Sequence, residues 1–295
     1  MYLIIGANGY LGSYITRTVL QKTTETVIAV CRNPLIQSTN SKIKQYSCDI
    51  AEYAQVDALA DFLKTFEEEI KVVYLAAYHH PDKVSKNPKF AWNINVTALS
   101  YFINRLENVK SFFYPSTDSV YGESENGYHF VETDKTNPVN IYGRQKVVAE
   151  QVVIGYGYNV VRYPFLIGKS LLENKPHFYD NIVDSLLNQK PVEMFSDSYR
   201  SSMSFATAAE LLIDLMESSL NYIPSIINIC GDEDLSKYDV GLMIADMLKV
   251  DRNLVIPVEM ALSKDIFETR RAQSTLMDNN LLKRLLDKPS IRLTF

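Results

Sequence analysis

The sequence predicts an α/β protein built on a doubly wound parallel sheet, with a smaller C-terminal region interleaved with it. Two observations predict this fold class. Short apolar segments alternate with amphipathic segments of helical length, which is the pattern of buried parallel strands joined by crossover helices. In addition, a glycine-rich turn that starts at Gly6 follows the first apolar segment and opens the first amphipathic one. With 295 residues, 46% of them hydrophobic and 22% charged, the chain is long enough to bury a large core.

The expected strands are short and strongly apolar. They comprise Tyr2–Ile5, Thr26–Cys31, Val72–Ala77, Phe112–Ser116, Val160–Tyr163 and Ile226–Ile229. The expected helices comprise Leu11–Gln21, Val56–Glu69, Phe90–Glu107, Tyr142–Ile154, Phe178–Gln189, Thr207–Ser219 and Lys237–Lys249. The regular alternation ends near residue 162. We therefore predict a dinucleotide-binding domain over residues 1–168, completed by the strand near 225–231, and an interleaved substrate-binding region over residues 169–295.

Composition and charge argue against several classes of protein. The net charge of −5 disfavours a broad nucleic-acid-binding surface, which requires clustered lysine and arginine. The three cysteines, Cys31, Cys48 and Cys230, form no Cys-x-x-Cys pair, so we expect no zinc ribbon or redox dithiol and assign no metal ligands. No basic leader precedes the first strand, and no apolar segment approaches the length of a membrane span. We therefore expect a soluble, cytoplasmic protein.

The glycine-rich turn has the spacing of a dinucleotide-binding site. It reads Gly6-Ala7-Asn8-Gly9-Tyr10-Leu11-Gly12. Gly6 allows the tight turn, Gly9 lets the backbone approach a pyrophosphate, and Gly12 allows the helix to pack closely on the strand. The free N–H groups at the helix N-terminus then face the phosphates. The residues expected to contact the cofactor are Gly6, Asn8, Gly9, Tyr10, Leu11 and Gly12.

The end of the second strand indicates which form of the cofactor binds. An NAD-binding site usually has an acidic residue there, which binds the ribose 2′-hydroxyl. This sequence has Arg32 instead, and no Asp or Glu lies between Ala29 and Leu35. Because a guanidinium can pair with a 2′-phosphate, we predict that NADP(H) is preferred. An arginine that stacks on the adenine would accept NAD(H) as well, so NAD(H) stays an alternative.

A Tyr-x-x-x-Lys pair marks a candidate catalytic helix. Tyr142 and Lys146 are four residues apart, so their side chains project from one face of a helix. We expect the ammonium to lower the pKa of the phenol, which would protonate a carbonyl oxygen while a hydride arrives at the carbon. The segment Ser116-Thr-Asp-Ser119 ends a buried strand, and a hydroxyl there would hydrogen-bond the same oxygen.

These motifs occur in the order typical of one family. Gly-x-x-Gly-x-x-Gly, Tyr74-Leu-Ala-Ala77, Asn93-Ile-Asn95-Val, Ser116-Thr-Asp-Ser-Val-Tyr-Gly122, Tyr-x-x-x-Lys and Asn228-Ile-Cys-Gly231 follow one another along the chain. The sequence resembles the extended short-chain dehydrogenases/reductases, which have a Rossmann fold and act on nucleotide sugars as epimerases, dehydratases and reductases. The resemblance implies that Thr117, Tyr142 and Lys146 are the catalytic residues.

The same resemblance implies further contacts to the cofactor. Asp49 and its neighbour Ile50 would meet the adenine. Ala76 and Ala77 would line the cofactor. Asn95 would brace the active site.

Within the family, the sequence is most similar to the dTDP-4-dehydrorhamnose reductase group. The similar segments are Ala76–Pro88, Ser116–Gly122, Val131–Gly143 and Arg271–Asp278. Relatives that dehydrate sugars carry Asp-Glu after the catalytic Thr, whereas this chain has Asp118-Ser119, and a serine cannot replace a carboxylate base. We therefore expect NADPH-dependent reduction of a 4-keto group on a nucleotide-linked deoxysugar.

Two alternatives stay open. One is a nucleotide-sugar epimerase that retains NAD. The other is a non-catalytic, cofactor-binding regulatory subunit, because Pro81-Asp-Lys-Val84 is similar to a segment in the reductase-like regulatory subunit of methionine adenosyltransferase.

The resemblance also suggests substrate contacts and an assembly. The candidate substrate residues are Asp118, His177, Arg200 and Arg271. In relatives, the helix with Tyr-x-x-x-Lys and the preceding long helix often pack against a second subunit. We therefore expect a possible homodimer, with an apolar surface formed by Trp92, Leu99, Phe102, Val147, Val148 and Val152.

Overall fold

The structure is a computed structural model that describes residues 1–33, 40–262 and 267–295. Its main sheet has the strand order β12-β7-β5-β4-β1-β2-β3, and every neighbouring pair is parallel. The strands are β1 (Tyr2–Ile5), β2 (Val27–Cys31), β3 (Ile43–Ser47), β4 (Ile70–Tyr74), β5 (Val109–Thr117), β7 (Asn159–Tyr163) and β12 (Ile226–Asn228). The predicted doubly wound sheet is confirmed. Its strand order reverses between β1 and β4, which is where such sheets bind ligands.

One strand of this sheet is missing from the sequence prediction. β3 has the sequence Ile-Lys-Gln-Tyr-Ser, and none of its five residues is fully buried. It pairs only with β2 and lies at the edge of the sheet. An edge strand has no need for a continuous apolar segment, so the hydrophobic pattern could not reveal it.

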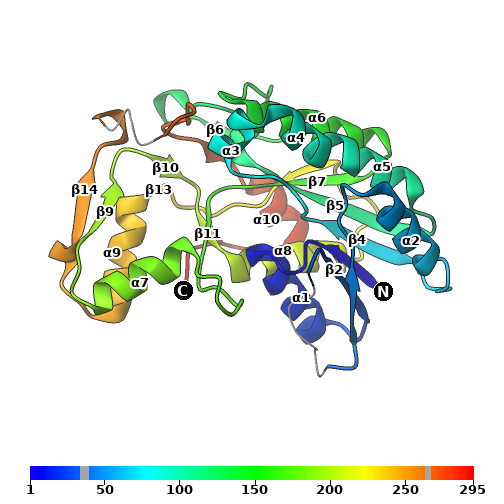
Figure 1. Ribbon diagram of the computed structural model, residues 1–295. Helices are drawn as coiled ribbons and strands as arrows, with labels where there is room; N and C mark the ends of the chain where they lie inside the picture. Colours follow the sequence, from blue (N-terminus) through cyan, green and yellow to red (C-terminus); the bar gives the residue numbers. More distant parts are fainter. Residues whose placement is uncertain (34–39, 263–266) are drawn as a thin grey trace.

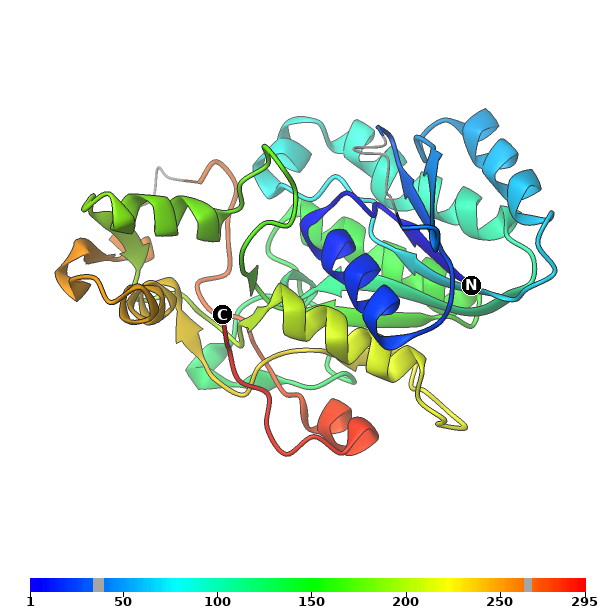
Figure 2. The same ribbon diagram turned by 90° about the horizontal axis from the view of Figure 1, so that it is seen from below.

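Helices cover both faces of the sheet (Figures 1 and 2). One face packs against α2 (Tyr53–Leu63), α5 (Ala98–Arg105) and α6 (Ile141–Gly155). The other packs against α1 (Tyr10–Lys22), α8 (Phe205–Met216) and α10 (Asn280–Leu286). Side chains of β1 alternate between these layers: Leu3 belongs to the first core and Ile4 to the second. In the described part of the chain, no helix is long and apolar enough to cross a lipid bilayer.

The C-terminal residues form a further core beside the sheet, on the left of Figure 1. It contains α7 (Phe178–Leu187), α9 (Lys237–Leu248) and the parallel pair β9 (Val192–Phe195) and β14 (Val255–Val258). Both helices were predicted, whereas β14 and α10 were not. The chain then returns to the sheet side, where β15 (Leu276–Met277) pairs with β6 (His129–Phe130).

The predicted helix Phe90–Glu107 is three consecutive helical segments. They are α4 (Pro88–Trp92), the π-helical turn η1 (Asn93–Thr97) and α5. Two of the apolar residues expected on its outer surface are not there: Leu99 and Phe102 are fully buried against the sheet. They lie on the helix face that covers β4 and β5, which the sequence alone did not distinguish from an outer face. Trp92 and Val148 are exposed, as expected.

Candidate active site

A cavity of about 710 Å³ opens where the carboxyl ends of the strands face the C-terminal core. Its volume lies within the range of small-molecule sites. Residues from both regions line it, among them Leu11, Thr117, Asp118, Tyr142, Phe165, Phe178, Phe195, Arg200, Lys237 and Arg271. The structure therefore brings two of the three predicted catalytic residues, and three of the four predicted substrate residues, to one cavity.

Thr117 and Tyr142 meet at one end of this cavity. Thr117 is the last residue of β5, and its side chain lies close enough to the Tyr142 hydroxyl to influence its titration. Thr117 Oγ1 also lies 2.9 Å from Asp118 Oδ1. Burial and the charge of Asp118 raise the pKa of Tyr142, and its interaction with Thr117 opposes this. The direction is opposite to the lowered pKa expected from the sequence, because burial outweighs the effect of the ammonium. The phenol is therefore protonated at neutral pH and can act as a proton donor.

Two local features of α6 place Tyr142 beside Thr117. The Asn140 side chain caps the helix by accepting a hydrogen bond from the Gly143 N–H at 2.9 Å. A Cβ atom at Gly143 would lie 2.6 Å from the carbonyl oxygen of Ser119, which is closer than real contacts allow. Glycine at this position therefore lets the catalytic helix approach the end of β5.

Lys146 lies one turn further along α6 and points toward β5. Its ammonium donates hydrogen bonds to the Tyr114 hydroxyl at 2.6 Å and to the Pro115 carbonyl at 2.9 Å. It also lies 3.9 Å from the centre of the Tyr114 ring. Burial lowers the pKa of Lys146 to about 7, although the charge of Glu150 opposes the shift. The sequence led us to expect the ammonium beside Tyr142, but here its hydrogen-bond partner is Tyr114.

A buried ionic network fixes α6 to the sheet. Glu150, which is fully buried, accepts a hydrogen bond from Ser116 on β5 at 2.5 Å and pairs with Arg162 on β7 at 2.6 Å. Arg162 is also almost fully buried and stacks on the Tyr121 ring. Removing one partner of such a pair leaves a buried charge, which is strongly destabilising. The network thus fixes the position of the helix that carries Tyr142 and Lys146.

The glycine-rich turn has the geometry that a dinucleotide requires. Gly6 has a φ of +86°, and a Cβ atom at Gly12 would clash with the Gly6 carbonyl. Gly9 is the N-cap residue of α1, and no side chain caps this helix. Glycines keep the backbone open and leave the first N–H groups of α1 without a side-chain acceptor, so the residues present fit a pyrophosphate.

The other predicted cofactor residues surround the same edge of the sheet. Arg32 follows β2 and is exposed, and its side chain forms no ion pair within residues 1–33, 40–262 and 267–295. Asp49 caps its own turn by accepting a hydrogen bond from the Ala51 N–H, and Ile50 is buried. Ala76 and Ala77 follow β4 and are partly buried.

Asn95 connects two segments beside the cavity through its side-chain hydrogen bonds. Its side chain hydrogen-bonds both backbone groups of Tyr78, at 2.8 and 3.1 Å, and Gln145 of α6 at 2.9 Å. It thereby joins the segment after β4 to the catalytic helix. Asn95 lies in the π-helical turn η1, and such turns are frequent at functional sites.

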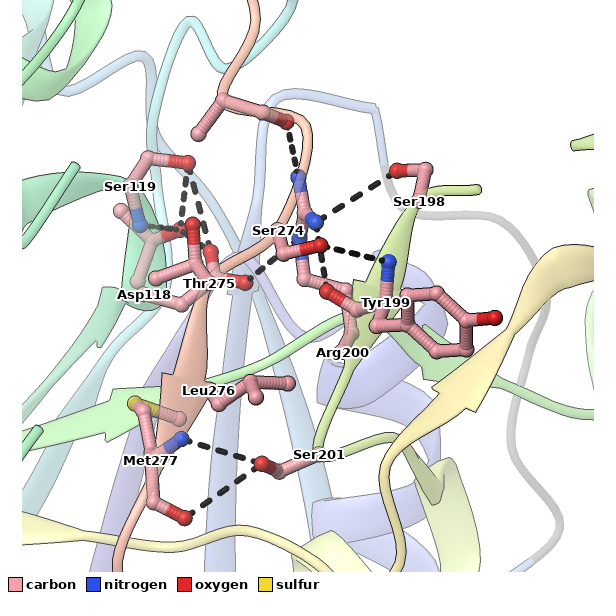
Figure 3. Close-up of polar contacts among 12 residues, drawn as sticks. Asp118, Ser119, Ser198, Tyr199, Arg200, Ser201, Ser274, Thr275, Leu276 and Met277 are labelled. Carbon is pink, nitrogen blue, oxygen red and sulfur yellow. Dashed lines mark hydrogen bonds and ion pairs between the residues drawn. The ribbon is translucent and has the colours of Figure 1, made fainter. Parts of the chain in front are cut away.

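Arg200 has most of its donors occupied by the protein (Figure 3). Its guanidinium donates to the backbone carbonyls of Tyr199, Ala272 and Gln273, and its Nε lies 3.3 Å from the Asp118 carboxylate. Figure 3 also shows hydrogen bonds from Tyr199 and Ser201 that join this segment to Ser274 and Met277. Arg200 therefore connects the segments that form this wall of the cavity. Burial raises the pKa of its partner Asp118.

The remaining substrate candidates differ from each other. Arg271 lines the cavity and pairs with Asp82 at 2.9 Å. His177 is not among the cavity-lining residues. It caps α7 by accepting a hydrogen bond from the Tyr179 N–H, and its ring packs on Tyr10 at 4.7 Å. These contacts are those of a packing histidine.

Several lining residues were not identified from the sequence. Phe165, Phe178, Phe195 and Lys237 line the part of the cavity that the C-terminal region supplies, which we call its opposite end. Tyr114, which accepts a hydrogen bond from Lys146, was also not identified, although it is not among the lining residues. Tyr114 lies inside an apolar strand, where the pattern indicates only burial. The other four come from separate elements of the C-terminal core and share no motif.

Comparison with known proteins identifies the family. The sequence profile described as "RmlD substrate binding domain" matches residues 1–292. The chain belongs to the RmlD substrate binding domain family. This RmlD-type chain is 22% identical over 268 residues to the probable low-salt glycan biosynthesis reductase Agl14 of Haloferax volcanii, covering 88% of this chain and 85% of the relative. It is 25% identical over 292 residues to mouse methionine adenosyltransferase 2 subunit beta, covering 96% and 81%.

Solved structures share the fold of the RmlD-type chain. A hypothetical dTDP-4-dehydrorhamnose reductase from Sulfolobus tokodaii has a TM-score of 0.80 at 22% identity, covering 100% of this chain and 97% of that one. The dTDP-4-dehydrorhamnose reductase of Bacillus anthracis in complex with NADP has a TM-score of 0.78 at 20% identity, covering 99% and 94%. UDP-glucuronic acid 4-epimerase from Bacillus cereus, bound to UDP-glucuronic acid and NAD, has a TM-score of 0.80 at 19% identity, covering 100% and 94%.

The family assignment supports an NAD(P)-dependent oxidoreductase of nucleotide-sugar type. It agrees with the resemblance seen in the sequence and with the Rossmann fold. The finer properties, which are the substrate, the cofactor form and the assembly, depend on this chain's own residues.

Proposed function

We propose that this chain reduces the 4-keto group of a nucleotide-linked deoxysugar with NADPH. The observation that carries the proposal is that Thr117 and Tyr142 line the same cavity and influence each other electrostatically, with Lys146 one helical turn away. A proton donor beside a second hydroxyl suits a carbonyl oxygen that must be held and protonated.

The chain's own groups supply binding and the proton. The nicotinamide cofactor, when bound, supplies the hydride that reaches the carbonyl carbon. Thr117 Oγ1 holds the carbonyl oxygen, and Tyr142 donates the proton to it. The Lys146 ammonium contributes positive charge near the site where negative charge develops. Dehydration needs a second carboxylate beside Asp118, and this chain has Ser119 there, which cannot act as a base at neutral pH.

Oxidation of NADPH by the protein in the presence of 4-keto-6-deoxy nucleotide sugars tests the proposal. Each keto sugar is incubated with NADPH, and absorbance of the reduced nicotinamide is followed. Oxidation of one equivalent of NADPH per sugar is the expected result. An unmodified nucleotide hexose should give no 4-keto-6-deoxy product by mass spectrometry. Formation of that product would overturn the reductase assignment.

The preference for NADPH follows from Arg32. An exposed guanidinium at the end of β2 has its donors available for a 2′-phosphate, and no carboxylate replaces it there. We expect NADPH to bind more tightly than NADH when both affinities are measured by titration. Equal dissociation constants would contradict this.

Two other functions give different results in the same assay. An epimerase interconverts sugars with retained NAD and consumes no NADPH. A regulatory subunit, which the similarity to mouse methionine adenosyltransferase 2 subunit beta favours, would bind the cofactor without turnover. Oxidation of stoichiometric NADPH excludes both.

A homodimer and a cytoplasmic location also belong to this proposal. The exposed residues Phe90, Trp92 and Val148 lie on α4 and α6, where a groove adjoins them. We expect a light-scattering mass of two chains at micromolar concentration. A mass of one chain would contradict the homodimer.

A further inference from the structure

The part of the cavity that the C-terminal region supplies contains a lysine among aromatic rings. Lys237 is the first residue of α9, and its Nζ lies 5.6, 5.4 and 5.5 Å from the ring centres of Phe165, Phe178 and Phe195. The three rings come from three separate segments of the chain. Within the described residues, no carboxylate or carbonyl accepts a hydrogen bond from this ammonium.

The other two cations that line the cavity already have acidic partners. Arg200 contacts Asp118 at 3.3 Å, and Arg271 contacts Asp82 at 2.9 Å. The charge of Lys237 is therefore the one left without a carboxylate in the cavity wall, as far as residues 1–33, 40–262 and 267–295 describe it.

The surroundings of Lys237 make its charged form less favourable than it is in water. The three ring faces attract the ammonium, but they supply no negative charge that could pair with it. Burial and the like charges of Arg200 and Arg271 lower the pKa of Lys237 to about 8. These two arginines are the titratable groups that act on it, and both repel it. An anion beside Lys237 would relieve the repulsion and restore the lost solvation.

We propose that Lys237 binds an oxyanion of the substrate in the part of the cavity that the C-terminal region supplies. This inference rests on the proposed function, because it takes the cavity as the substrate site. Two sources of oxyanion fit a nucleotide sugar: the diphosphate that joins nucleoside and sugar, or a carboxylate on the sugar ring. In either case the lysine holds a part of the substrate that does not react, while Tyr142 and Thr117 hold the carbonyl.

Matched charge-removing variants test the site. Lys237→Met keeps most of the side chain and removes the charge. Lys44→Met is the control, since Lys44 also lies over an aromatic ring, that of Phe66 at 4.8 Å, but is exposed on the edge strand β3. Lys237→Arg keeps the charge. NADPH affinity and the circular dichroism spectrum report whether each variant is folded.

Calorimetric titration with defined ligands separates the two sources of oxyanion. If the diphosphate binds Lys237, the Met variant loses at least about tenfold in affinity for UDP and dTDP, and Lys237→Arg retains much of it. If a sugar carboxylate binds, UDP affinity is unchanged, but the preference for UDP-glucuronate over UDP-glucose is lost. Lys44→Met should match the parent both in its affinity for UDP and dTDP and in its preference for UDP-glucuronate. Affinities within twofold of the parent for every ligand, or no binding of any of them to the parent, would overturn the proposal.

The pH dependence adds a readout that a purely structural lysine would not produce. The anion binds the protonated amine, so affinity in the parent should fall as the pH rises from about 6.5 to about 9, and the Met variant should show no such fall. Titration is independent of turnover. If no keto sugar consumes NADPH but Lys237→Met still loses the nucleotide, the reductase proposal fails and the oxyanion site stands.

Discussion

The two ends of the cavity are built in different ways. At the reacting end, Thr117, Tyr142 and Lys146 come from one strand and one helix, and short-range contacts fix them. At the opposite end, Phe165, Phe178, Phe195 and Lys237 come from four segments that meet only through the C-terminal core. The reacting end holds polar groups in hydrogen bonds, whereas the opposite end holds an ammonium among rings, for which the described residues supply no carboxylate partner.

This difference separates chemistry from substrate selection. A proton donor and its supporting hydroxyl need fixed geometry, which a helix packed on a strand provides. Selection of a substrate needs a surface that can change without disturbing that geometry. We therefore expect substitutions at the reacting end to lower kcat, and substitutions at the opposite end to raise KM.

Tyr142→Phe should have the largest effect. It removes the proton donor and keeps the ring, so kcat should fall on the order of 10²–10⁴-fold while NADPH affinity stays within twofold. Tyr163→Phe is the control, because Tyr163 lines the same cavity but its hydroxyl donates to the Ala208 carbonyl. Steady-state kinetics measure both variants. Parent-like turnover in Tyr142→Phe would exclude the proton-donor role.

Local motifs made the reacting end predictable from the sequence. Tyr142 and Lys146 share a helix face because they are four residues apart, and Gly6 to Gly12 form a turn whose φ angles and close contacts require glycine. The direction of Lys146 was not predictable, because Tyr114 reaches it from a neighbouring strand.

The other features of the fold and the cavity depend on contacts between segments far apart in the sequence, so the sequence alone did not reveal them. Strand β3 is polar because it lies at the edge of the sheet. Leu99 and Phe102 looked like an interface but cover the sheet. Lys237 belongs to no motif, and only the folded C-terminal core brings it to the cavity.

Arg32→Ala tests the choice of cofactor at a third place, because Arg32 lies at neither end of the cavity. It should weaken NADPH binding roughly 10–100-fold, which is the loss expected for hydrogen bonds to a charged group, and leave NADH binding unchanged. The effect should shrink at high ionic strength, because the guanidinium is exposed. Dissociation constants for both cofactors test this. Equal losses for NADPH and NADH would indicate stacking on adenine instead.

Phe195→Leu should act at the opposite end only. Loss of one ring beside Lys237 should raise KM for the nucleotide sugar by up to about tenfold, with little change in kcat, because binding to ground and transition states is lost equally. Phe66→Leu, in the first core far from the cavity, is the matched control. A fall in kcat without a change in KM would show that the two ends are not separate.

Tyr114→Phe should produce the smallest change in kcat/KM. It tests how the protonation of Lys146 is controlled at the reacting end. The Tyr114 hydroxyl accepts a hydrogen bond from the Lys146 ammonium at 2.6 Å, so removing it disfavours the charged form. Because the pKa of Lys146 is about 7, a further fall of about one unit would leave only about a tenth of the molecules protonated at pH 7.

The expected result is a fall of about fivefold in kcat/KM at pH 7, which disappears as the pH is lowered and Lys146 is protonated again. The limb of the pH profile that follows Lys146 should therefore move to lower pH. Tyr74→Phe supplies the control, since the neighbouring Tyr74 hydroxyl is buried and has no hydrogen-bond partner within the described chain. An unchanged pH profile in Tyr114→Phe would mean that the Pro115 carbonyl alone holds the ammonium in place. A shift in Tyr114→Phe that Tyr74→Phe does not share would assign the tuning of Lys146 to Tyr114, a residue that touches neither the reacting oxygen nor the opposite end.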